Sequence, residues 1–126
     1  MTVDEFKKYI AEHDKVVVYC GSNTYLPNTL IGNDCFRTIV YKLGDKYKYL
    51  MLDTEGTSIH IGNHFNDVFS ISYTIPIIFL YRKGVEIGRN RKGIGRKGDF
   101  TEELEYSNIG KYIHWIDTTF ENEENS

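Results

Sequence analysis

The stretch that decides the fold is Ser72-Tyr-Thr-Ile-Pro-Ile-Ile-Phe-Leu-Tyr-Arg-Lys-Gly-Val-Glu-Ile-Gly88. Its apolar run over 77–81 predicts a buried strand, and the run over 85–89 predicts a second one. Pro76 stands just before the first strand, where its missing backbone N–H removes no ladder hydrogen bond. Gly84 can supply the positive φ that a tight turn needs, so the two strands are expected to form an antiparallel hairpin.

The rest of the chain alternates helical and strand patterns. Thr2 and Glu5 form a capping-box pattern before a run with helical spacing, which predicts a helix at the N-terminus. Gly32 lies inside a second helical pattern and is expected to kink or interrupt it, while Ser107 is expected to cap the last helix. The predicted helices cover 2–13, 25–43, 63–70 and 107–120, and the predicted strands cover 16–20, 47–53, 77–81 and 85–89.

This order of elements predicts an α/β fold. Strands that alternate with helices run parallel and are joined by right-handed crossovers, whereas the closing hairpin adds antiparallel strands. We expect a central mixed sheet of four or five strands flanked by helices, with 16–20, 47–53 and 77–81 in its middle and with Val17 and Ile78 almost fully buried. Residues 1–120 form one domain in this interpretation, and the acidic tail 121–126 is expected to fray.

Composition and charge limit the classes of protein to which the chain can belong. The 126 residues carry a net charge of −3, and no apolar run is long enough to span a bilayer. Two cysteines do not make a disulfide framework, and the N-terminus lacks the apolar core of a signal peptide, so we expect a cytoplasmic protein. No cofactor is predicted. The many tyrosine, isoleucine, lysine and asparagine residues are typical of an AT-rich genome, such as that of a low-GC bacterium or its phage.

Taken together, the order and spacing of these elements resemble the thioredoxin-like family. The matching parts are the Val-Val-Val-Tyr strand, the long helix after a short loop, the Tyr-Leu-Met-Leu-Asp strand, the Ile-Pro hairpin and the last helix. The resemblance implies that the Ile75–Pro76 peptide bond is cis and that the surface beside it binds extended peptide segments. The interval between Asp53 and Pro76 is several residues longer than in a minimal thioredoxin, and the extra residues are placed at 54–62.

The pair of cysteines that carries out the chemistry of that family is absent from its expected position. Thioredoxins carry Cys-x-x-Cys at the start of the long helix, where the helix N-terminus lowers the pKa of the attacking thiol. Here that motif falls on about Thr24 to Pro27, and none of these positions holds a cysteine. Cys20 and Cys35 are 15 positions apart, which excludes the same dithiol arrangement. Free cysteines are most often small buried apolar residues, and this interpretation is favoured for both.

The favoured function is therefore that of a redox-inactive thioredoxin-like domain that binds proteins, as an adaptor module. The absence of the dithiol motif favours a binding protein over an enzyme, with a protein as its partner. The alternative is a non-standard thiol–disulfide oxidoreductase that uses Cys20. The expected binding surface comprises Asn23, Thr24, Tyr25, Leu26, Pro27, Thr74, Ile75 and Pro76.

A second alternative is a nucleic-acid-associated accessory protein. It would use the basic span 82–97, whose cations are Arg82, Lys83, Arg89, Arg91, Lys92, Arg96 and Lys97. Charge runs are usually solvated, so nucleic-acid binding is not favoured. Glycines in a dinucleotide-binding spacing end this span, but they follow a hairpin and do not open a helix. His60 and His64 are four apart without a full set of ligands, so no metal site is predicted.

Overall fold

The structure is a computed structural model that describes residues 2–21, 27–53, 76–90 and 98–124. Within these ranges the elements are α1 (Val3–Glu12), β1 (Lys15–Gly21), α2 (Pro27–Leu43), η1 (Gly44–Lys46), β2 (Lys48–Asp53), β3 (Ile77–Arg82), β4 (Val85–Arg89), η2 (Tyr106–Asn108) and α4 (Ile109–Glu124). The helix expected over 63–70 and the insertion expected over 54–62 lie outside the described residues.

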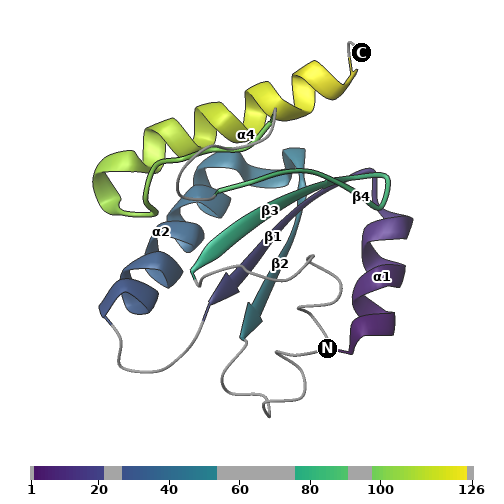
Figure 1. Cartoon of the computed structure of the whole chain (residues 1–126), viewed down its shortest axis with the longest axis horizontal. Helices are drawn as coiled ribbons and strands as arrows, with labels where there is room; N and C mark the ends of the chain where they lie inside the picture. Colours follow the sequence, from purple (N-terminus) through teal and green to yellow (C-terminus); the bar gives the residue numbers. More distant parts are fainter. Residues whose placement is uncertain (1, 22–26, 54–75, 91–97, 125–126) are drawn as a thin grey trace.

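The strands form a mixed sheet in the order β2-β1-β3-β4 (Figure 1). β1 pairs in parallel with β2 and antiparallel with β3, and β3 pairs antiparallel with β4. The turn between β3 and β4 consists of Lys83 and Gly84, with φ of 51° and 82°. Two positive φ angles suit a two-residue hairpin, so the predicted hairpin and the role of Gly84 are confirmed.

One strand lies elsewhere than expected. The sequence predicts 47–53 in the middle of the sheet, but in the described residues β2 is an edge strand that pairs only with β1. An apolar run indicates that both faces of a strand are covered, but it does not tell how many strands lie beside it. This is why the prediction about its place was wrong although the strand itself was correctly identified.

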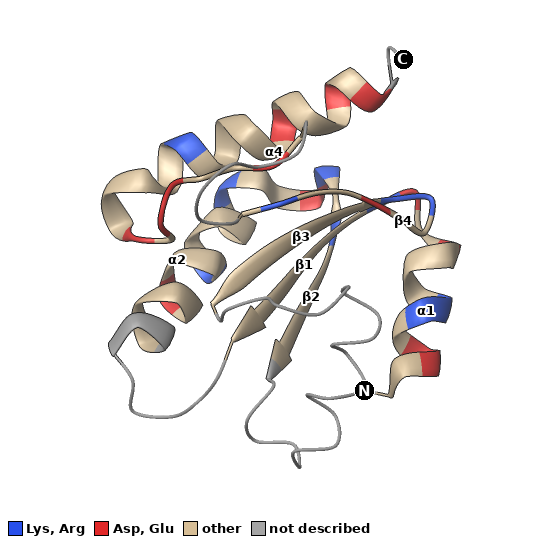
Figure 2. Ribbon diagram, in the orientation of Figure 1, with Lys and Arg blue, Asp and Glu red and all other residues tan. Residues whose placement is uncertain are grey.

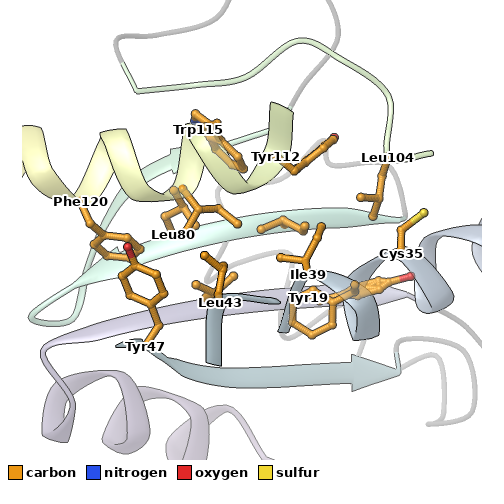
Figure 3. Close-up of a cluster of buried hydrophobic side chains, with 14 residues drawn as sticks. Tyr19, Cys35, Ile39, Leu43, Tyr47, Leu80, Leu104, Tyr112, Trp115 and Phe120 are labelled. Carbon is orange, nitrogen blue, oxygen red and sulfur yellow. The ribbon is translucent and has the colours of Figure 1, made fainter. Parts of the chain in front are cut away.

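Two hydrophobic cores lie on opposite faces of the sheet. α2 and α4 cover one face (Figure 3). On this face alternate residues of β1 and β3, among them Val17 and Ile78, are fully buried. α1 covers the other face, where Phe6 and Ile10 pack against the intervening residues of the same strands. Both predictions of burial are confirmed, and the alternation follows from the period of two along a strand.

The helix boundaries follow the predicted signals in part. At α1 the Glu5 N–H donates to the Thr2 hydroxyl at 3.1 Å and the Thr2 N–H donates to the Glu5 carboxylate at 3.0 Å, which confirms the capping box. Ser107 lies inside η2 and donates to Glu105, so the prediction that it caps the last helix was wrong. α2 is one helix through Gly32, and α4 continues to Glu124, so the expected frayed tail is helical over 121–124.

The outer edge of β4 is covered by the segment 98–100. The Phe100 N–H donates to the Arg89 carbonyl at 2.9 Å, and the Trp115 indole donates to the Gly98 carbonyl at 2.7 Å. A Cβ on Gly88 would lie 2.3 Å from the Gly98 carbonyl oxygen, so this close approach requires glycine. β4 is therefore protected as an edge strand, whereas no described segment covers the outer edge of β2.

Candidate functional site

Pro76 packs directly on α2 at the start of β3. A Cβ added to Gly32 would lie 2.7 Å from both the Cβ and the Cγ of Pro76, so only glycine allows the helix backbone to approach the proline ring this closely. α2 begins at Pro27, where proline is well suited because the first helical N–H has no partner within the helix. The structure thus brings Pro76 against the first turns of the helix that Pro27 starts.

A buried polar pair holds the end of β1 to the same part of α2. The Tyr19 hydroxyl donates to the Asn33 side-chain oxygen at 2.5 Å, and both residues are buried. Burial raises the pKa of Tyr19 well above its ordinary value, so the hydroxyl stays protonated and remains a donor. A Cβ on Gly21 would lie 2.6 Å from the Asn33 oxygen, which shows how closely this pair is enclosed.

Cys20 lies in β1 but faces away from α2. It is fully buried in the core on the α1 face, with Val18 and Ile77 in the same cluster. Burial raises the pKa of its thiol strongly, which opposes formation of the nucleophilic thiolate. Cys20 therefore lies on the face of the sheet opposite to α2, at whose start the resemblance places the reactive thiol of a thioredoxin.

Cys35 lies in α2 and is buried on the other face, where Figure 3 shows its thiol beside Leu104. Burial, and the nearby charges of Asp34 and Glu105, raise its pKa from 9.0 to about 11. Both cysteines are free, and the sheet separates the clusters to which they belong. The two thiols therefore cannot form the disulfide of a dithiol cycle in this structure.

The structure describes only two of the eight residues of the predicted binding surface. Asn23, Thr24, Tyr25, Leu26, Thr74 and Ile75 lie outside the described residues, and with them the predicted cis peptide bond. Pro27 and Pro76 are placed as described above. Sequence reasoning missed Gly32, which it interpreted as a kink. A glycine inside a helical pattern also signals close packing, and that is its role here.

In the part of the basic span that the structure describes, the cations do not gather into one exposed patch. Arg89 is 6% exposed, and its guanidinium donates to both carboxylate oxygens of Glu86, at 2.5 and 2.9 Å. A bulge between Leu80 and Tyr81 in the β3–β4 register places Glu86 and Arg89 on one face although they are three apart. The charge of Arg89 is thus neutralised inside the protein and is not available to a nucleic acid.

The other cations of the basic span either lie apart from one another or fall outside the described residues. Arg82 pairs with Asp14 at 2.7 Å, and Lys83 is exposed in the hairpin turn. Arg91, Lys92, Arg96 and Lys97 lie outside the described residues. Figure 2 shows positive and negative residues interspersed over the described helices and strands.

The described ranges contain neither a metal-binding cluster nor a helix that could span a membrane. No group of three or more His, Cys, Asp or Glu residues is arranged there to hold a metal ion. No helix in that part of the chain combines the length and the apolar character needed to cross a membrane.

Comparison with solved structures identifies the fold. Thioredoxin from Trypanosoma brucei brucei superimposes with a TM-score of 0.62 at 14% identity, covering 95% of this chain and 87% of that one. Mitochondrial thioredoxin 3 from Saccharomyces cerevisiae gives 0.60 at 16% identity, covering 90% and 89%. Oxidised thioredoxin from Plasmodium falciparum gives 0.58 at 13% identity, covering 89% and 93%.

No protein-family model matches the chain, and no curated protein matches its sequence. The structural likeness establishes a thioredoxin-like α/β fold, which confirms the predicted fold class. The Cys-x-x-Cys motif is absent from the sequence.

Proposed function

We propose that this protein is a redox-inactive thioredoxin-like domain that binds an extended segment of a partner protein beside Pro76. The single observation that carries the proposal is the placement of its two thiols. Cys20 and Cys35 are both fully buried and lie on opposite faces of the sheet. A domain with this fold and without an accessible thiol retains the surface at the start of β3 and α2, but it has no means of exchanging disulfides.

The contact between Pro76 and Gly32 supports this surface as the binding site. Pro76 is partly exposed while its ring rests on α2, so it is held in place without being enclosed. This contact holds Pro76, the residue immediately before β3, at a fixed place against the helix. Preorganisation of a binding surface lowers the entropy that is lost when a partner docks. Main-chain pairing with an incoming segment would then supply affinity.

The experiment is a selection of peptides from a displayed library, followed by titration of the selected peptide against three proteins. The wild-type protein should bind it. Gly32→Ala should weaken binding at least tenfold, because the new Cβ displaces Pro76. Gly110→Ala is the matched control, since it also adds a methyl group to a helical glycine, but in open space.

Two results would overturn the proposal. One is a peptide that binds all three proteins equally, because the Pro76 surface would then not be the site. The other is a selection that yields only peptides joined to the protein by a disulfide, which would favour the oxidoreductase alternative through Cys20.

A further inference from the structure

A cavity lies along one side of α4 and shares no residue with the Pro76 surface. Phe100 forms one of its walls, and α4 forms the rest between Gly110 and Thr119. Every residue that lines it belongs to the described part of the chain. Its volume is about 510 Å³, which is within the range of sites that bind small molecules.

The aromatic rings of Trp115 and Phe100 give the cavity a rigid apolar floor. The two rings are stacked, with centroids 5.3 Å apart and planes 13° from parallel. The indole N–H of Trp115 donates to the Gly98 carbonyl at 2.7 Å, so the ring is held in one orientation and its donor is already used. A planar apolar group can lie on such a floor in an offset or edge-on arrangement.

Gly110 leaves room at one end of the cavity. A Cβ at this position would meet nothing within 4 Å, so packing inside the protein does not require a glycine there. Glycine is nevertheless less favourable than alanine in a helix. The space left by the missing side chain opens into the cavity, where a bound molecule can fill it.

A polar side chain at the other end lacks a partner. Thr119 is 8% exposed and lines the cavity, and its hydroxyl makes no hydrogen bond to a described residue. The hydroxyl of Thr38 shows the usual arrangement in a helix, because it donates to the Asp34 carbonyl at 3.0 Å. A hydroxyl taken largely out of water is costly unless it is paired, so Thr119 favours a ligand with a polar atom at this end.

The charge of the lining favours an anion. Lys111 and His114 line the cavity, and none of the lining residues, all of them described, is acidic. The Lys111 amine lies 3.7 Å from the Glu102 carboxylate, but both side chains are largely exposed and such pairs are weak. Lys111 and Thr119 are eight positions apart on α4, which separates them by about 12 Å along the helix axis.

We propose that this cavity binds an elongated aromatic carboxylate that carries a second polar group at its far end. The rings lie on Trp115, the carboxylate meets Lys111 and the second polar group meets Thr119. A fused two-ring acid with a hydroxyl at the opposite end fits the separation of these two side chains. This site is independent of the peptide-binding function proposed above.

Two probes and two variants test the recognition. The probes are 6-hydroxy-2-naphthoate and 2-naphthoate, which differ only in the far hydroxyl. The wild type should bind the first with a Kd of about 1 mM or tighter and the second at least threefold more weakly. Thr119→Val should remove this difference without weakening 2-naphthoate, whereas Lys111→Gln should weaken both probes at least fivefold. Isothermal titration calorimetry measures the affinities, and quenching of Trp115, the only tryptophan in the chain, reports binding at the cavity.

A third variant blocks the space itself. Gly110→Leu places a good helix former at an open position and should weaken both probes at least tenfold. Tyr41→Leu is the control, because Tyr41 is 86% exposed in α2 and does not line the cavity, and it should bind like the wild type. A wild type that binds neither probe up to about 1 mM would overturn the proposal. Equal affinities of the wild type and Gly110→Leu would overturn it as well, and so would a Thr119→Val variant that still prefers the hydroxylated probe.

Discussion

Gly32 and Gly110 lie within the α-helices α2 and α4 and have opposite surroundings, which gives the sharpest prediction at the scale of single residues. A Cβ on Gly32 would meet Pro76 at 2.7 Å and the Tyr19 hydroxyl at 2.9 Å, whereas a Cβ on Gly110 would meet nothing within 4 Å. Gly32→Ala should therefore destabilise the fold by about 1–3 kcal/mol through overpacking. Gly110→Ala should be neutral or stabilise it by up to about 1 kcal/mol through helix propensity.

Urea unfolding of both variants beside the wild type measures these changes in the free energy of unfolding. The difference between the two variants is the informative quantity, because both add the same methyl group to a helix. If Gly32→Ala were as stable as Gly110→Ala, the close contact between α2 and Pro76 would not exist.

Cys35 gives a prediction about alkaline pH. Its pKa is raised from 9.0 to about 11 in the folded protein, chiefly by burial and also by Asp34 and Glu105. Because the folded state holds the thiol proton more tightly, this residue's contribution to stability is complete below pH 9 and is lost as the pH rises towards 11. Other buried groups with raised pKa values, such as Tyr112, act in the same direction.

The measurement compares urea unfolding of the wild type and of Cys35→Ala at pH 7, 9 and 10.5. The stability of the wild type should fall more steeply above pH 9 than that of Cys35→Ala. Identical pH profiles would mean that Cys35 ionises as readily in the folded protein as in the unfolded chain.

At this scale the sequence predicts local features well. The capping box of Thr2 and Glu5 and the positive φ of Gly84 depend on neighbours within a few positions, and both are present. The role of Gly32 could not be predicted in the same way. It depends on Pro76, which is distant in the chain and is placed against α2 by the tertiary fold.

At the scale of elements, the bulge in the β3–β4 pair creates an ion pair inside the protein. The side chains of Arg89 and Glu86 are 7% and 15% exposed and their charged groups are in contact. Arg89→Met should destabilise the fold by about 3–5 kcal/mol, because it removes the guanidinium and leaves the Glu86 carboxylate in a poorly solvated place. Thermal or urea unfolding measures the loss.

A double variant provides the control. Glu86→Gln combined with Arg89→Met removes both charges and should recover much of the stability that the single variant loses. If the double variant were less stable than the sum of the two single variants predicts, the loss would come from packing against Phe79, whose ring lies 4.7 Å from the guanidinium.

The strands and helices themselves were predicted from the sequence more completely than their arrangement in the sheet. All four strands and three helices of the described ranges follow from their hydrophobic periods and turn residues. The position of β2 at the edge does not, because an apolar run indicates that both faces of a strand are covered and does not tell how many strands lie beside it. The bulge in β4 could not be predicted from the sequence either, because it depends on the register in which β4 pairs with β3.

At the scale of the whole molecule, the order of elements was sufficient to predict the fold. Alternating helices and strands with a final hairpin allow few arrangements, and the thioredoxin-like one is observed. The candidate site was predicted less fully. Of its eight residues, Pro27 and Pro76 belong to the described ranges, and the contact through Gly32 that links Pro76 to α2 was found only in the structure.

The central claim is that this thioredoxin-like fold works without thiol chemistry. The most direct test is reduction of insulin disulfides with dithiothreitol as the electron source, using the wild type and Cys20→Ser. Because both native thiols are buried and protonated, the wild type should give the same rate as dithiothreitol alone. A clear acceleration by the wild type that disappears in Cys20→Ser would contradict the claim and establish an oxidoreductase.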